Sequence, residues 1–192
     1  MLHNLISRCP SIENPTLIYC LGLKKFQALK PLKYFCIFPT YRLFDSVYVE
    51  GSSLRYLCYE HSTGRLGEIK VNACQNLRVL YLKSASITDQ WLCDLNTKFP
   101  HLHSLTLFSC DLLEKVHISS HSLKDFTLIN FRKLQEAEID TPNLQKTTAK
   151  FDLHSGMQLN TDWLLELREF LEKPIQIKTL VLGLFGEVRL DK

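Results

Sequence analysis

The stretch "CDLLEKVHISSHSLKDFTLINFRKLQEAEIDTPNLQKTTAK", residues 110–150, starts a short apolar pattern about every ten residues. Each pattern follows the frame L-x-x-L-x-L, with other apolar residues in place of some leucines, as in Leu123-x-x-Phe126-x-Leu128. The leading positions are Leu113, Leu123, Leu134 and Leu144. Alternation with a period of two residues is typical of a strand that points one side chain inward and the next outward. The stretch therefore predicts a series of short strands.

The same frame extends over most of the chain. Its leading residues recur with a mean spacing of 22 residues, at Ile12, Leu32, Leu54, Leu77, Leu102, Leu123 and Leu144. A weaker copy begins about halfway between them, at Leu23, Phe44, Leu66, Leu113 and Leu134. A period of roughly 20–29 residues with this frame is the signature of a leucine-rich-repeat solenoid. No single copy can bury its own inward row, so neighbouring copies must stack.

The expected fold class is α/β, a mostly β leucine-rich-repeat solenoid. Each main copy supplies one strand of a parallel sheet, and the weaker copies make the return legs largely extended. Two short helices are expected, at residues 88–98 and 161–172. Trp91, Leu92 and Leu95 recur at helical steps in the first, and Thr161, Trp163 and Leu167 open the second in a similar way.

The expected domain organisation divides the chain near residue 150. Residues 1–150 are predicted to form the leucine-rich-repeat solenoid. Residues 151–192 are predicted to form a C-terminal helix–strand repeat or cap, because a helical pattern is followed there by the apolar run "IKTLVLGL" at residues 177–184.

Composition limits the possible function classes. The 192 residues are 45% hydrophobic and 22% charged, which predicts a packed interior. The net charge of +3 is spread without a run of five like charges, and no apolar stretch has the length of a membrane span, so neither a nucleic-acid nor a membrane partner is expected. Seven irregularly spaced cysteines without a C-x-x-C pair predict reduced thiols and a cytoplasmic or nuclear location.

No motif indicates an enzyme, a metal or a cofactor. The sequence contains neither a phosphate-binding G-x-x-x-x-G-K-[ST] loop nor G-x-G-x-x-G or G-x-S-x-G. Four histidines near Cys110 raise the alternative of a zinc site, namely His101, His103, His117 and His121. Their spacing matches no known ligand set, which favours surface histidines. A Cys–His nucleophile is conceivable, but no cysteine is singled out: Cys9 and Cys74 fit core positions, and Cys20 and Cys110 fit the turns after strands.

The outward positions of the main strands are the candidate functional surface. The expected partner-binding residues are Tyr34, Phe38, Tyr56, Tyr81 and Phe108. We expect four of these aromatic rings, those of Tyr34, Tyr56, Tyr81 and Phe108, to lie side by side on consecutive strands. The outward positions of the return strands are mostly charged. Aromatic residues on an exposed sheet are typical anchors of protein interfaces. The alternative is that they stack across strands and contribute only stability.

Several runs of the chain resemble the repeat region of plant F-box/leucine-rich-repeat proteins. They include "SLRYLCYE" at residues 53–60, a C-x-x-L-E-K element at 110–115 and an I-D-x-P-N-L element at 139–144, and the resemblance covers about residues 5–182. In that family an N-terminal F-box binds the adaptor of a cullin ubiquitin ligase, and the repeats hold the protein to be ubiquitylated.

The resemblance implies a protein-binding module that recognises ligase substrates, with a target protein that the sequence does not identify. No part of this sequence resembles an F-box, so we expect adaptor binding only if an F-box lies upstream. The alternative is a free-standing leucine-rich-repeat scaffold, or a truncated remnant, without a link to a ligase.

Overall fold

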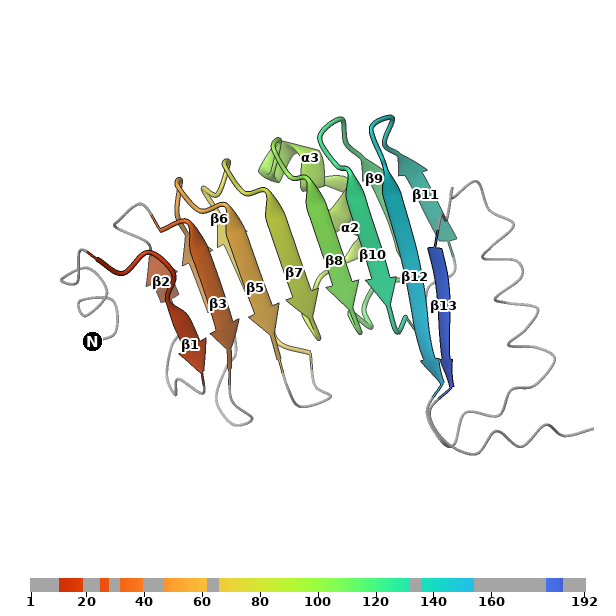
Figure 1. Cartoon of the computed structure of the whole chain (residues 1–192), viewed down its shortest axis with the longest axis horizontal. Helices are drawn as coiled ribbons and strands as arrows, with labels where there is room; N and C mark the ends of the chain where they lie inside the picture. Colours follow the sequence, from red (N-terminus) through yellow and green to blue (C-terminus); the bar gives the residue numbers. More distant parts are fainter. Residues whose placement is uncertain are drawn as a thin grey trace, which may run out of the picture.

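The computed structural model describes residues 11–18, 25–27, 32–39, 47–61, 66–131, 136–153 and 179–184. Within these ranges the chain coils into a two-layered solenoid, with a long parallel sheet on one side and shorter elements on the other (Figure 1). The predicted helix at residues 161–172 lies outside the described residues.

The first layer is a single parallel sheet of eight strands, ordered β1-β3-β5-β7-β8-β10-β12-β13. The strands are β1 (Thr16–Ile18), β3 (Tyr34–Phe38), β5 (Tyr56–Glu60), β7 (Val79–Lys83), β8 (Ser104–Phe108), β10 (Asp125–Ile129), β12 (Lys146–Leu153) and β13 (Thr179–Leu184). Consecutive main copies of the repeat are therefore neighbours in the sheet, as the frame predicts. Strand β12 crosses the predicted boundary near residue 150, and the division into two domains stays a prediction.

The second layer contains the return legs of the coils. Strands β2 (Lys25–Gln27), β4 (Val47–Glu50) and β6 (Ile69–Asn72) form a three-stranded parallel sheet, and β9 (Lys115–Ser119) pairs with β11 (Glu136–Asp140). The helices α2 (Asp89–Cys93) and α3 (Leu95–Lys98) lie between these two small sheets (Figure 1). The predicted extended return legs and the helical exception are both confirmed.

The core lies between the two layers. Leu57, Leu80, Leu105 and Phe126 are register partners on four successive strands, and all four side chains are completely buried. Valine and isoleucine side chains of the return strands close the core from the other side, including Val47, Val49, Val116 and Ile118. Each buried aliphatic side chain stabilises the fold by about 1.5–3 kcal/mol. The predicted stacking of inward rows is confirmed.

A left-handed backbone residue follows three of the main strands. Ser84, Ser109 and Asn130 have φ values of 51°, 48° and 55°, and each comes directly after its strand. The Ser84 amide donates to the Phe108 carbonyl at 2.8 Å, and the Ser109 amide donates to the Ile129 carbonyl at the same distance. Ser84 and Ser109 therefore extend the sheet ladder by one step, where the chain turns toward the second layer.

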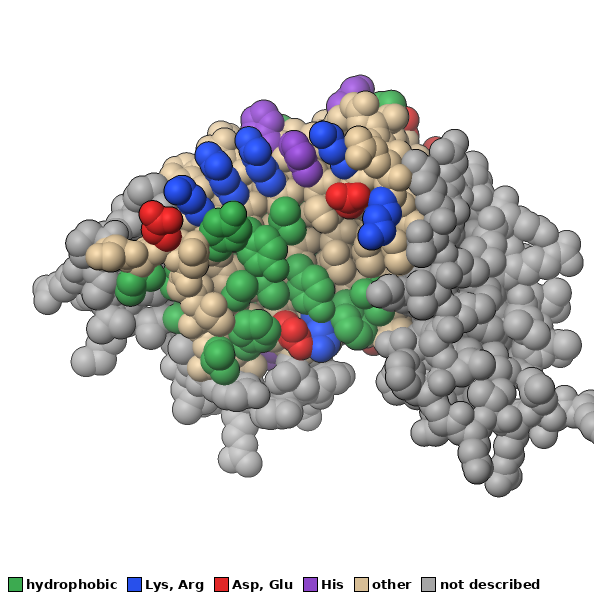
Figure 2. Space-filling model, in the orientation of Figure 1, with side chains coloured by type: hydrophobic (Ala, Val, Ile, Leu, Met, Phe, Trp, Pro, Cys, Tyr) green, Lys and Arg blue, Asp and Glu red, His purple; other side chains and the backbone are tan. Residues whose placement is uncertain are grey.

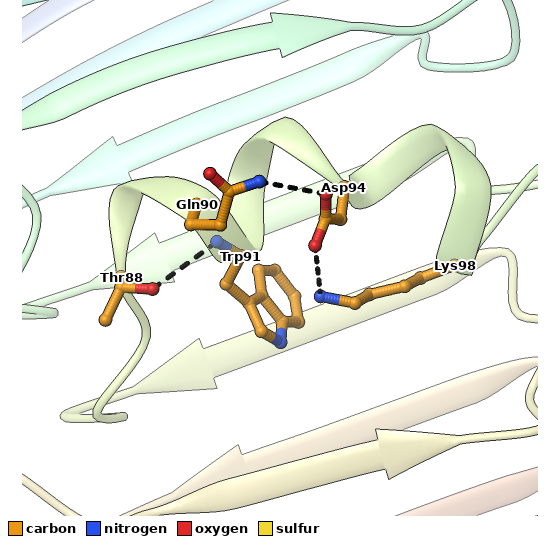
Figure 3. A network of polar contacts seen from close by, with 5 residues as sticks. All are labelled: Thr88, Gln90, Trp91, Asp94 and Lys98. Carbon is orange, nitrogen blue, oxygen red and sulfur yellow. Dashed lines mark hydrogen bonds and ion pairs between the residues drawn. The ribbon is translucent and has the colours of Figure 1, made fainter.

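The helical segment differs from the predicted single helix at residues 88–98, because it is divided at Asp94. The ψ angle of Asp94 is 1°, well away from the helical value near −42°. Figure 3 shows that Gln90 Nε2 and Lys98 Nζ both bond its carboxylate, at 3.1 and 3.3 Å. At the start of α2, Thr88 Oγ1 accepts a hydrogen bond from the Trp91 amide at 3.4 Å.

Candidate protein-interaction surface

The outward side chains of β3, β5, β7, β8 and β10 form the surface that we call the front face. Strand register arranges them in rows that cross the sheet. The first row contains Tyr34, Tyr56, Val79, Ser104 and Asp125. The second contains Cys36, Cys58, Tyr81, Thr106 and Thr127. The third contains Glu60, Lys83, Phe108 and Ile129.

The four aromatic residues lie on the consecutive strands β3, β5, β7 and β8, as expected, but they run diagonally across these rows. Tyr34 and Tyr56 are register partners, with ring centroids 5.8 Å apart. Tyr81 is aligned with Cys58, and Phe108 with Lys83. The reason is the position in the repeat frame: Tyr56 is two residues after its leading leucine, Tyr81 four and Phe108 six. Phe38 shares the frame position of Phe108 and is aligned with Ile18 at the end of β1.

The hydrophobic part of the front face is partly open to solvent. Tyr34 is 48% exposed, and Tyr56, Tyr81, Phe38 and Phe108 are half-buried. Figure 2 shows hydrophobic side chains gathered in the middle of this face. Burial raises the pKa of Tyr81 to about 12 and also raises that of Tyr56. Both phenols are therefore neutral at physiological pH and offer apolar area together with a hydroxyl.

The two thiols of the front face are protonated at neutral pH. Cys36 and Cys58 are register partners, and Cys58 is buried among the outward side chains. Burial raises the pKa of the Cys58 thiol to about 12 and also raises that of Cys36. Because the thiolate is the reactive form, these cysteines act as small apolar groups of the surface.

A polar contact lies beside Phe108. Lys83 Nζ donates a hydrogen bond to Glu60 Oε1 and lies 5.0 Å from the centroid of the Phe108 ring. The ammonium group is therefore held by both a carboxylate and an aromatic face. This arrangement keeps the Phe108 ring in place at the margin of the hydrophobic area.

A row of basic side chains, which the sequence analysis missed, borders the same face. It contains Lys33, Arg55, Arg78, His103 and Lys124, each one residue before a main strand. The amide of each of the last four donates to the carbonyl of the preceding member at 2.8–2.9 Å. Figure 2 shows Lys, Arg and His side chains in line along this edge. The signal was present in the sequence, since all five follow the leading leucine of a repeat.

The return strands carry a different surface. Lys70 Nζ lies 3.0 Å from Glu68 Oε1, donates to the Tyr48 hydroxyl at 3.3 Å, and stands 5.1 Å from the Tyr48 ring centroid. Farther along, His117 Nδ1 lies 3.3 Å from Glu138 Oε2. The predicted charged character of this side is confirmed, and Lys70 has an acidic neighbour on the same side.

The histidines considered for zinc are dispersed. His101 and His121 are exposed, and His103 Nδ1 lies 2.7 Å from the His101 carbonyl oxygen. Within the ranges that the structure describes, no three His, Cys, Asp or Glu side chains are grouped as a metal site requires. Among the same residues, no helix combines the length and the apolar character of a membrane span.

The structure describes one cysteine predicted for the core, Cys74, and one predicted for a turn after a strand, Cys110. Cys74 is buried and its Sγ donates to the Asn72 carbonyl at 3.2 Å. Cys110 is completely buried in the turn after β8, with Sγ 3.6 Å from the Phe108 carbonyl oxygen. Both roles are confirmed, whereas Cys9 and Cys20 lie outside the described residues.

Comparison with known proteins identifies the repeats. The family model described as "At1g61320/AtMIF1, LRR domain" matches residues 20–179, more than four-fifths of the chain. The searches of curated proteins and of solved structures found no significant match.

Proposed function

Because the chain belongs to the plant leucine-rich-repeat family of the At1g61320/AtMIF1 type, we propose that its front face binds a target protein. Leucine-rich-repeat domains are typically interaction modules without catalytic activity of their own. One observation carries the proposal: a continuous parallel sheet presents partly exposed aromatic side chains outward, while the aliphatic rows that hold the fold together are inward. Partly exposed tyrosines on a rigid sheet are effective anchors, because little side-chain freedom is lost on binding.

The alternative of pure cross-strand stacking accounts for less of this surface. Tyr34 and Tyr56 do contact each other, but the diagonal arrangement puts Tyr81 beside Cys58 and Phe108 beside Lys83. Among the described front-face rings, Tyr34 and Tyr56 are the one pair in ring contact. The diagonal instead spreads aromatic area over four strands, which suits contact with a second macromolecule.

We further propose that the bound target is a substrate of an F-box ubiquitin ligase. The support is the resemblance of the elements at residues 110–115 and 139–144 to those of F-box/leucine-rich-repeat proteins. In this arrangement the protonated thiols of the front face take no part in ubiquitin transfer, which other ligase components perform. An F-box upstream would bind the adaptor. The second candidate function is that of a free-standing scaffold.

We also propose a cytoplasmic or nuclear location. The five cysteines among the described residues are free thiols, namely Cys36, Cys58, Cys74, Cys93 and Cys110. Reduced cysteines are typical of proteins in these compartments. Imaging of the tagged full gene product tests this location, and accumulation in the secretory pathway would contradict it.

The binding proposal is tested with matched aromatic variants. Partners captured by the full gene product are identified, and their affinity is measured for the purified Tyr56→Ala/Tyr81→Ala protein and for the return-face control Tyr48→Ala. Binding should weaken by more than about 30-fold, since the loss of a single hot-spot residue already costs at least about 2 kcal/mol. An unchanged affinity of the front-face variant, or an equal loss of affinity in the control, would contradict the proposal. Circular dichroism verifies that each variant is folded.

The ligase link is tested by the fate of the captured partner. In cells that express the full gene product, its ubiquitylation should fall with Tyr56→Ala/Tyr81→Ala, and the ligase adaptor should co-purify with the wild-type protein. If the partner binds but its ubiquitylation and half-life are unaffected, the scaffold function is the correct one.

A further inference from the structure

The side chains of the basic row are mostly open to solvent. Lys33, Arg55, Arg78 and Lys124 are exposed, and the carbonyl-to-amide ladder holds their backbones on neighbouring strands. Adjacent strands of a sheet are about 4.8 Å apart, so like charges at one frame position repel each other. Among the described residues, no carboxylate lies within 4.0 Å of Arg55, Arg78 or Lys124. An anionic group from outside the chain would relieve this repulsion.

One end of the row already carries such a group. Glu13 Oε2 lies 3.7 Å from Lys33 Nζ, and both side chains are about half exposed. A carboxylate can therefore approach the row from the solvent side. The return strands differ, because Lys70 is matched by Glu68 and His117 by Glu138 on the same surface.

The row also adjoins the hydrophobic part of the front face. Lys33 and Arg55 directly precede Tyr34 and Tyr56, whose rings contact each other. Figure 2 shows the basic side chains along one edge and the hydrophobic side chains immediately beside them. A ligand that covers both must combine negative charge with apolar groups.

We propose that the front face recognises an acidic segment of a polypeptide, with carboxylates on the basic row and apolar side chains on Tyr34, Tyr56 and Tyr81. This inference rests on the proposed function and specifies the chemistry of the partner. A nucleic acid fits less well, because its phosphates are continuous and would also meet the carboxylates of Glu60 and Asp125 on the same face, whereas a peptide can place its acidic residues at the basic row alone. The exposed phenol of Tyr34 and the apolar Val79 also suit peptide side chains.

The test is a selection of random 12-residue displayed peptides on the immobilised protein. Selected peptides should be enriched in Asp or Glu together with apolar residues. Synthetic copies are then measured by fluorescence anisotropy against the wild type and Arg55→Gln/Arg78→Gln. The affinity should fall about tenfold in this variant, because two exposed charge pairs are lost. It should also fall between 0.1 and 1 M salt, where the screening length shortens from about 10 to about 3 Å.

Three further proteins or probes make the result decisive. Arg55→Lys/Arg78→Lys keeps the charges and should retain most of the affinity, whereas Lys70→Gln/Lys115→Gln removes two cations from the return strands and should have no effect. A single-stranded oligonucleotide should bind more weakly than the selected peptides. Tighter oligonucleotide binding, or neutral peptides whose binding is insensitive to the arginines, would overturn the inference.

Failure of this inference and failure of the proposed function give different results. If neutral peptides are selected and Tyr56→Ala/Tyr81→Ala abolishes their binding, the front face binds proteins but the acidic specificity is wrong. If the affinity for the selected peptides falls with Lys70→Gln/Lys115→Gln and not with the front-face variants, the proposed function itself is wrong. An absence of any enriched peptide counts against both.

Discussion

Replacing Gly67 by alanine tests how closely the two layers of the solenoid approach each other. Tyr59 occupies the inward position that Leu82, Leu107 and Leu128 fill in the following coils. Its side chain is longer than that of leucine and is completely buried. A Cβ at Gly67 would lie only 2.0 Å from the Tyr59 hydroxyl oxygen. The glycine is therefore required because a tyrosine stands where other coils have leucine.

The expected cost of Gly67→Ala is about 1–3 kcal/mol, the range for overpacking a closely packed core. The overlap involves the rigid end of a buried ring, and a second contact of 2.8 Å to His61 Cδ2 limits the available movement. Tyr59→Phe removes the hydroxyl and should restore much of the loss. On its own Tyr59→Phe should be neutral or slightly stabilising, since the hydroxyl has no hydrogen-bond partner among the described residues.

The assay is urea unfolding followed by circular dichroism for the wild type, both single variants and the double variant. The double-mutant cycle should give a coupling free energy of about 1 kcal/mol or more, with the double variant more stable than Gly67→Ala. Additive effects of the two substitutions, or an unchanged stability of Gly67→Ala, would refute the proposed close approach.

Three other predictions concern the core, the helical coil and the thiols. Leu105→Ala, in the completely buried row, should destabilise the protein by about 2–5 kcal/mol, measured by urea unfolding against the outward control Thr106→Ala. Asp89→Ala should lower stability by about 1–3 kcal/mol in the same assay, because Asp89 Oδ1 accepts the amides of residues 114 and 115 at 3.1 Å; no change would exclude this anchor. Peptide mapping after alkylation at pH 8 should find the exposed Cys93 modified well before Cys58, and the reverse order would contradict the burial that raises the pKa of Cys58 to about 12.

The strands could be predicted because the residue pattern within each repeat determines where its strand lies and which side chains point inward. The leading leucine and the inward positions after it define the strand, and residues such as Leu80 and Leu105 are aligned wherever the frame is kept. The extended return legs follow from the weaker copies in the same way. The diagonal of aromatic rings also follows from frame positions, but only when Tyr56, Tyr81 and Phe108 are numbered from their own leading leucines.

Other features depend on contacts that a repeat frame does not contain. The close approach of Gly67 to Tyr59 joins two layers, and its partners are not related by the repeat. The break at Asp94 is seen in its ψ angle of 1°, and no glycine or proline marks it in the sequence. The residues of the basic row share one position of the repeat frame, which the sequence shows. They form one surface only because the backbone ladder between neighbouring strands brings that position of every coil to the same edge.

Site-specific photo-crosslinking tests the central claim, that the front face is the binding surface, most directly. A photoreactive amino acid is placed at Thr106, in the middle of the front face between Tyr81 and Thr127, and separately at Lys70 on the return strands. With the bound partner present, adducts should form from position 106 and not from position 70. Adducts from position 70 alone would contradict the account.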